Sequence, residues 1–243
     1  MQTGDGLEAA SPARIGLGAR FLGVITSPRE TFERVAADPR WIGMLALGAG
    51  VVALVSSVLV SADFAQREML EQQVSSMEAF GVTVTDDVYA DLEQGLGIAP
   101  YTTLGTLLAG IPIVCAILAG LLYGVGYGFL GARASFAQVF AVVVHAGPVF
   151  VVAQLFVAPL NYARESITSP STLAAFAPLI DDDTFAYKLL STIDLFHVWW
   201  VMILAIGLAV LWKRGTAPIA TTLYGTYAGI VLIIAVLRTN FGF

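Results

Sequence analysis

Residues 103–130 have the sequence TLGTLLAGIPIVCAILAGLLYGVGYGFL, a stretch without a single charged side chain. A hydrocarbon core about 30 Å thick takes about 20 helical residues to cross, so this stretch is long enough to span a membrane. Its apolar residues do not alternate with polar ones, as they would in a strand of a membrane β-barrel. Because only a helix satisfies the backbone hydrogen bonds within such a segment, the sequence predicts a transmembrane helix here.

Four further stretches have the same apolar character and a comparable length: 41–62, 136–160, 194–212 and 218–237. Short links, 131–135 and 213–217, join two pairs of spans, and each pair is therefore expected to form an antiparallel hairpin. The predicted fold class is all-α: a polytopic membrane protein with five transmembrane helices, a cytoplasmic amphipathic segment at the N-terminus and small helical extracytoplasmic loops.

The composition supports this class. Hydrophobic residues make up 57% of the 243 residues and charged residues only 12%, whereas a soluble domain carries about 25% charge. This argues against a soluble enzyme or a nucleic-acid module. The net charge of −6 also argues against a polyanionic partner, so no nucleic acid is expected. The single cysteine, Cys115, cannot form an internal disulfide or a cysteine-ligated metal site.

Catalytic motifs give no support for an enzyme. Residues 126–131 match the GxGxxG pattern, but they end an apolar helix instead of joining a strand to a helix start, so the match does not predict a dinucleotide site. HExxH, GxSxG and Walker A motifs are absent from the sequence. We therefore expect no catalytic, cofactor-binding or metal-binding residues, and no cofactor.

Lysine and arginine residues predict the orientation of the chain in the membrane, because they are enriched in cytoplasmic loops. Eight lie before the first span or in the two short links, and four lie on the other side. The N-terminus and the short links are therefore expected in the cytoplasm. Five spans then place the C-terminus, with a short tail at 238–243, on the extracytoplasmic side.

Residues 1–40 are expected to form a cytoplasmic interfacial segment. Ser27, Pro28 and Glu30 predict a helix start with a capping box, and Phe32 and Val35 follow on one side of that helix. A basic amphipathic segment beside a span is typical of a helix on the anionic leaflet. Packing against the underside of the helix bundle is the alternative, and the sequence leaves both open.

The loops at 63–102 and 161–193 are expected outside the cell. In the first, Gly81 ends one predicted helix and Thr85 starts the next, giving an acidic hairpin that is either a docking surface or a solvated lid. In the second, Ser169 and Pro170 predict a helix start. The three aspartates at 181–183 lack the alternate spacing of a calcium-binding EF-hand loop, which favours a solvated cluster over a metal site.

Polar residues within or beside spans are candidates for function, because each is costly in a membrane. Asp194 is expected to bond its own helix start, within a capping box begun by Ser191, and His197 lies one turn further on the same face. His145 precedes a predicted kink at 147–148 and is expected to bond a carbonyl freed there. A cavity lined by His145, Gln154 and His197 would indicate transport.

Small residues recur every four positions in two spans, which allows close helix packing in lipid. We expect them either to pack within the bundle or to contact a partner. The short link at 131–135 forces the second and third spans together, so internal packing is the expected outcome for the second span. The residues concerned are Ala116, Gly120, Gly124 and Gly128 in the second span, and Gly225 and Gly229 in the fifth.

Four stretches resemble the bacterial branch of the Yip-domain family, whose eukaryotic members interact with Rab GTPases. They are residues 27–32 (SPRETF), 38–41 (DPRW), 135–141 (SFAQVFA) and 194–200 (DLFHVWW). The Asp-Leu-Tyr-Gly-Pro motif of eukaryotic members is absent, so the resemblance does not imply a Rab partner. It implies a five-span domain at 41–237 in a bacterial inner membrane. Some bacterial relatives are associated with ABC exporters, which implies an accessory role.

The sequence therefore supports two hypotheses from different classes. The first is a non-enzymatic accessory subunit that contacts the lipid bilayer and another membrane protein, such as an ABC exporter, or a second copy of itself. The alternative is a small transporter, channel or lipid-handling protein with a cavity near Gly147 and Pro148. A packed bundle with an exposed groove of small residues would favour the first hypothesis, and a polar-lined cavity would favour the second.

Overall fold

A computed structural model describes residues 16–241, so residues 1–15 of the predicted N-terminal segment and the last two residues of the predicted tail lie outside it. Five helical segments within this range are long and apolar enough to cross a membrane. This confirms the predicted all-helical, five-span architecture. The segments are α3 (Ile42–Val60), α6 (Ala99–Leu130), α7 with α8 (Phe136–Ala146 and Pro148–Arg164), α10 (Leu195–Trp212) and α11 (Thr216–Phe241).

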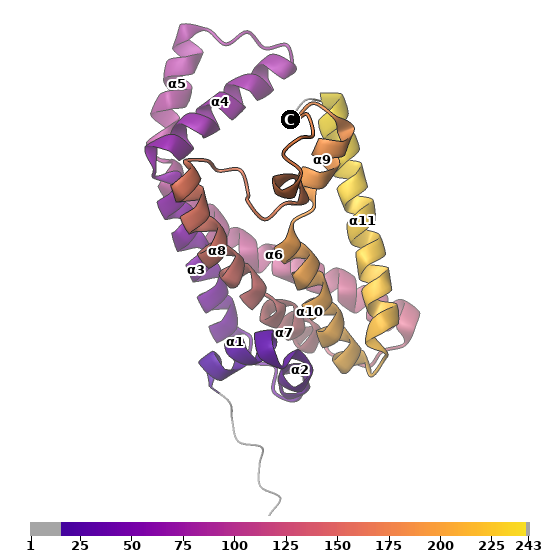
Figure 1. Cartoon of the computed structure of the whole chain (residues 1–243). Helices are drawn as coiled ribbons and strands as arrows, with labels where there is room; N and C mark the ends of the chain where they lie inside the picture. The colour runs from indigo at the N-terminus through magenta and orange to yellow at the C-terminus, as the bar shows by residue number, and fades with distance from the viewer. Residues whose placement is uncertain (1–15, 242–243) are drawn as a thin grey trace, which may run out of the picture.

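Two spans are longer than their apolar stretches indicate. α6 begins at Ala99, four residues before the predicted start, and its 32 residues extend over about 48 Å at 1.5 Å per residue. That exceeds the hydrocarbon thickness of about 30 Å, so α6 fits a membrane at a slant. In Figure 1 it crosses obliquely behind α8 and α10. α11 continues to Phe241, so most of the predicted tail at 238–243 belongs to this helix.

The third span is broken where Gly147 and Pro148 predict a kink. α7 ends at Ala146 and α8 begins at Pro148, whose nitrogen carries no hydrogen to continue the helical bonding pattern. The Gly147 N–H instead donates to the Val144 carbonyl at 3.0 Å, which tightens the last turn of α7. The break separates a deeply buried α7 from an α8 whose outer half faces a cavity.

The N-terminal helices α1 (Leu17–Thr26) and α2 (Pro28–Ala37) lie across one end of the bundle (Figure 1). α2 packs against α7 and α10, where Phe32 and Val35 are completely buried. Packing on the bundle, one of the two alternatives left open by the sequence, is thus observed for α2. Contact of this region with the leaflet stays a prediction, for which Leu22 of α1 offers an exposed side chain.

The predicted capping box at Ser27 is wrong. The Ser27 side chain makes no capping hydrogen bond to α2; its carbonyl instead accepts a hydrogen bond from the Thr31 hydroxyl at 3.0 Å. A complete capping box stands at the start of α7, where Ser135 and Gln138 bond each other's backbone. Gln138 Nε2 also donates to the Ala36 carbonyl at 2.9 Å and so ties α2 to α7.

The opposite end of the molecule carries the two longer loops. The first forms a helical hairpin of α4 (Asp63–Ala79) and α5 (Asp86–Leu96). Gly81 turns the chain with a φ of 77°, and the Thr85 hydroxyl caps α5 by accepting the Val88 N–H. Figure 1 shows this hairpin projecting from the end opposite α1 and α2.

The second loop differs from its prediction. No α-helix starts at Ser169 and Pro170 among the described residues; a four-residue 3-10 helix, η1 (Leu173–Phe176), follows instead, and then α9 (Phe185–Thr192). The reason is a backbone bridge between Thr172 and Asp194. Its hydrogen bonds, Leu173 N–H to Ile193 O at 2.9 Å and Leu195 N–H to Ser171 O at 3.0 Å, hold this segment extended.

The core lies where α2, α7 and α10 meet, and a glycine makes this approach possible. A Cβ atom placed on Gly207 of α10 would lie 2.7 Å from Val142 Cγ1 and 2.9 Å from Phe32 Cε1. Neither neighbour has free space, because Phe32 and Val142 are both completely buried. Gly207 does not belong to a repeat of small residues, so the sequence does not indicate this close contact.

We expect Gly207→Ala to lower the thermal stability of the purified protein in detergent. Overpacking of a core costs about 1–3 kcal/mol, which exceeds the gain of about 1 kcal/mol for replacing a helical glycine with alanine. Gly124→Ala is the matched control, because nothing lies within 4 Å of its Cβ position. That variant should melt at or above the wild-type temperature, and equal melting of both variants would contradict the packing described.

Candidate functional site

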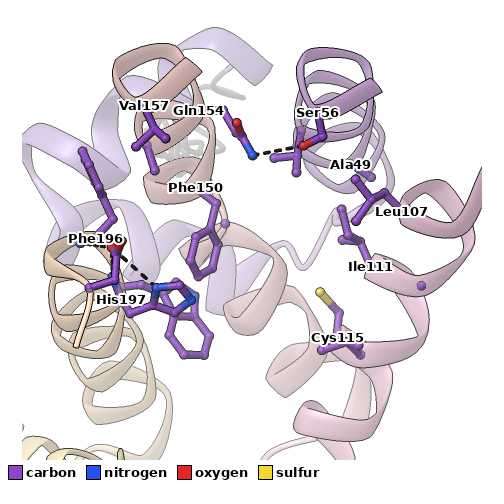
Figure 2. Close-up of a pocket in the computed structure, with 18 of the residues that line it drawn as sticks. Ala49, Ser56, Leu107, Ile111, Cys115, Phe150, Gln154, Val157, Phe196 and His197 are labelled. Atoms are coloured by element: carbon purple, nitrogen blue, oxygen red, sulfur yellow. Dashed lines mark hydrogen bonds and ion pairs between the residues drawn. The ribbon is translucent and has the colours of Figure 1, made fainter. Parts of the chain in front are cut away.

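A cavity of about 830 Å³ lies between α3, α6, α8 and α10 (Figure 2). Ligand pockets commonly measure about 300–1,000 Å³, so this volume is sufficient for an organic ligand. In Figure 2, Leu107, Ile111 and Cys115 of α6 face Phe150 of α8 and His197 of α10 across the open space. The slant of α6 creates this space, since α6 packs along α3 and α7 and meets α10 at Gly126, near the C-terminal end of α6.

The walls of the cavity are mainly apolar. α3 and α6 supply aliphatic side chains, and α8 and α10 supply aromatic ones, including Phe150, Phe196 and Trp200. These spans are apolar on every face, so the sequence does not distinguish the cavity wall from the lipid-facing surface. Aliphatic side chains on the wall include Leu45, Ala49, Val52, Leu107, Ile111 and Val114.

Asp194 is the centre of the polar end of the cavity. As the N-cap of α10, its carboxylate accepts hydrogen bonds from the Phe196 N–H at 2.8 Å and the His197 N–H at 3.4 Å. The hydroxyls of Ser169 and Ser171 donate to its other oxygen. The Asp194 carboxylate thus accepts hydrogen bonds from four donors in the folded protein.

His197 completes this polar group. Its Nδ1 lies 3.6 Å from Asp194 Oδ1, so the two predicted candidates are neighbours. Burial alone would raise the pKa of the Asp194 carboxyl, but hydrogen bonds from His197, Ser171 and the Phe196 N–H outweigh it and hold the pKa well below its usual value. The carboxylate is therefore charged at neutral pH.

The predicted capping box from Ser191 to Asp194 is wrong, although Asp194 does bond its own helix start. Ser191 belongs to α9, where its hydroxyl donates to the Lys188 carbonyl at 3.1 Å and accepts from Arg238 at 2.8 Å. Ser191 and Asp194 have the spacing of a capping box, but Ser191 lies in α9 and Asp194 precedes α10, so the two residues do not cap the same helix.

Gln154 reaches across the cavity from α8. Its Nε2 donates to the Ser56 hydroxyl of α3 at 3.2 Å (Figure 2). The bond links two walls of the cavity, and both residues line it. Gln154 and His197, two of the three residues expected to line a transport cavity, are therefore brought to one cavity together with Asp194.

His145 lies elsewhere. It is completely buried in the core, and its Nδ1 lies 2.8 Å from the Ala141 carbonyl in its own helix. The carbonyl at the kink, that of Val144, is taken by the Gly147 N–H, so the expected bond from His145 to a freed carbonyl is wrong. His145 is not among the residues that line the cavity.

Asn161 is a cavity residue that the sequence analysis missed. It is 2% exposed, lines the cavity, and its Oδ1 accepts no hydrogen bond from the described residues. The sequence pattern predicts a loop from position 161 onward, but α8 continues to Arg164. The sequence feature that indicates a cavity position for Asn161 is its spacing of seven residues from Gln154, because residues seven apart lie on one face of a helix.

The small-residue stripes face away from the described chain. Nothing lies within 4 Å of a Cβ placed on Gly120, Gly124 or Gly128 of α6, or on Gly225 or Gly229 of α11. The exposed Ala116 belongs to the same surface of α6. The expectation that this stripe packs internally in the second span is therefore wrong.

The contact of α6 with α10 is made by Gly126. A Cβ there would lie 2.9 Å from the ring of Trp212, so α6 meets α10 through Gly126. Arg214 adds a hydrogen bond to the Leu130 carbonyl at 3.0 Å and brings the two short links together. The exposed stripe of α6, defined by Ala116, Gly120, Gly124 and Gly128, is not covered by residues 16–241.

No group of three or more histidine, cysteine, aspartate or glutamate side chains that could hold a metal ion occurs within residues 16–241. The candidate site consists of a cavity that is polar at the end near Asp194, and of exposed glycine surfaces on α6 and α11.

Comparisons with known proteins give one match. No curated protein and no solved structure matches the chain. The family model of the Yip1 domain matches residues 22–238, which include α2, the first four spans, most of α11 and both longer loops. On the strength of a match over nearly its whole length, this chain belongs to the Yip1 domain family of multi-pass membrane proteins.

Proposed function

We propose that this protein is a non-catalytic accessory subunit of a membrane complex, and that the exposed stripe of α6 contacts a helix of its partner. The observation that carries the proposal is the absence of any described atom within 4 Å of the Cβ positions of Gly120, Gly124 and Gly128. Stripes of small residues allow close backbone approach in lipid, and the fold leaves this stripe free. An ABC exporter, implied by the family resemblance, is the first partner to test.

Gly124→Leu tests the proposal. The added bulk would separate helix backbones, so recovery of the partner by affinity purification in mild detergent should fall at least about ten-fold, a change of roughly 1.4 kcal/mol. The melting temperature of the subunit itself should not fall, because the position has no internal contact. Gly105→Leu is the control, since Gly105 of α6 is equally free of contacts but lies outside the stripe.

Several outcomes would change the proposal. Recovery that is equal for wild type and Gly124→Leu would contradict an interface at this stripe. Light scattering could show that Gly124→Leu loses a dimer while no other protein is lost from the purified sample. That result would indicate that the partner is a second copy of the chain. A lower melting temperature of Gly124→Leu would indicate that the stripe packs within the subunit.

We further propose a cytoplasmic N-terminus, an extracytoplasmic C-terminus and a location in a bacterial inner membrane. The unequal distribution of basic residues supports the orientation. So does the clustering of α1, α2 and both short links at one end, opposite α4, α5 and α9 (Figure 1).

In a Cys115→Ser background, a cysteine at Glu78 or Asp182 should react with an impermeant maleimide added outside cells, and one at Arg133 should not. Reversed labelling would overturn the orientation.

A second function, the handling of a membrane-soluble molecule, is favoured by the cavity. Gln154, Asp194 and His197 line it together with apolar side chains, which is the arrangement expected for an amphipathic ligand. This proposal is compatible with the first, since the stripe of α6 faces outward and the cavity lies on another side of that helix.

A further inference from the structure

The cavity contains a buried acceptor without a donor. Asn161 is 2% exposed, and its Oδ1 accepts no hydrogen bond from the part of the chain that the structure describes. An amide oxygen shielded from solvent is costly to leave unpaired. Since Asn161 also lines the cavity, a molecule bound there is placed to supply the missing donor.

The charges around the cavity limit the headgroup of such a molecule. The Asp194 carboxylate already accepts four hydrogen bonds, so it needs no further donor from a ligand. No lysine or arginine lines the cavity within residues 16–241. The group in the cavity that can carry a positive charge is His197, and it is paired with Asp194. A phosphate would therefore approach a carboxylate whose counter-charge is already engaged, which is unfavourable in a medium of low dielectric constant. A neutral group with an O–H donor fits these partners.

The apolar part of the cavity fits hydrocarbon and does not continue as a pore. Aliphatic side chains of α3 and α6 line it. Towards the cytoplasmic end, the buried core of α2, α7 and α10 closes the space with residues that include Phe32, Val142 and Leu208. A cavity that is polar at its outer end and closed at its inner end matches a lipid with its polar group outward.

We infer that this cavity binds a neutral lipid alcohol of the diacylglycerol type. Its hydrocarbon lies between α3, α6 and α8, and its hydroxyl donates to Asn161 Oδ1. The inference rests on the second function proposed above and adds the class of ligand. It does not depend on the partner of the α6 stripe.

A photoreactive diacylglycerol tests the assignment. The full-length protein in a neutral detergent is irradiated with the diacylglycerol, or with the matching phosphatidic acid, which carries a phosphate in place of the hydroxyl. Diacylglycerol should crosslink at least about ten-fold more than phosphatidic acid, and to peptides of α3, α6 and α8. Saturating diacylglycerol should also slow alkylation of Cys115, the single cysteine of the chain, which lines the cavity (Figure 2).

Two variants separate the headgroup from the hydrocarbon. Asn161→Leu removes the acceptor and should weaken binding up to about ten-fold, the effect of one hydrogen bond. Ile111→Trp fills the cavity without changing its polar end and should abolish crosslinking, which keeps the test informative if Asn161→Leu does not fold. Ile113→Trp is its matched control on the same helix, because Ile113 is 57% exposed and faces away from the cavity.

The possible failures have different meanings. Equal or greater capture of phosphatidic acid within the cavity would overturn the ligand class and leave the second proposed function intact. Absence of crosslinking by both lipids would overturn the inference and that function together. Crosslinking that survives in Ile111→Trp would show binding at an outer surface of the bundle, and would also overturn the inference.

Discussion

Phe32→Ala is expected to destabilise the folded protein more than any other single change considered, by about 3–5 kcal/mol, the usual cost of removing a buried phenylalanine side chain. Phe32 is completely buried and fills the space that Gly207 and Val142 leave between α2, α7 and α10. Thermal unfolding in detergent, followed by tryptophan fluorescence, would measure the effect.

Phe80→Ala is the matched control for this change. Phe80 follows α4 in the hairpin of α4 and α5 and is 65% exposed, so its removal should alter the melting temperature little. Wild-type stability in Phe32→Ala would contradict the packing of α2 on the bundle. It would favour the other arrangement that the sequence allows, in which this segment lies on the membrane surface.

Asp194→Ala is expected to have the second largest effect, about 2–4 kcal/mol. The change removes the N-cap of α10, which costs about 1 kcal/mol. It also leaves the hydroxyl of Ser171, only 3% exposed, without its acceptor, at about 1–3 kcal/mol. The segment between α8 and α9 should become more accessible to proteases, because Asp194 holds Ser169 and Ser171 at the start of α10. Asp182→Ala, in the exposed part of the same loop, is the control.

The pH dependence of the Asp194→Asn variant gives an independent check. The folded pKa of Asp194 lies below its unfolded value of about 3.9. Such a carboxylate stabilises the folded state fully above the unfolded pKa, and this stabilisation is lost as the pH falls through the folded pKa. The stability difference between wild type and Asp194→Asn should therefore decrease as the pH falls below about 4. A difference that grows as the pH falls below about 4 would contradict the assignment.

Much of the architecture follows from local sequence. A run of about 20 apolar residues needs a helix wherever it meets hydrocarbon, which is why all five spans were predicted at positions close to the observed ones. The break at Gly147 and Pro148 and the cap at Thr85 are local as well, because each depends on the backbone chemistry of neighbouring residues.

Helix ends beside the outer loops were harder to predict, because contacts between distant residues compete with local signals. Ser169 and Pro170 have the pattern of a helix start, yet the bridge from Thr172 to Asp194 holds that segment extended. Asn161 follows an apolar stretch, and the end of that stretch predicts a loop, whereas α8 continues past Asn161 and buries its side chain in the cavity wall.

The amino-acid sequence alone was sufficient for the number of spans, their approximate ends and the family resemblance, because hydrophobic length and short motifs are properties of neighbouring residues. The contacts of each helix face depend on tertiary packing. α6 is apolar all round, so nothing in its sequence distinguishes Gly126, which packs on Trp212, from Gly124, which meets nothing. The slant and rotation of a helix in a bundle arise from contacts with all its neighbours. Those contacts determine that Gln154, Asn161 and Asp194 share one cavity while His145 is enclosed in the core.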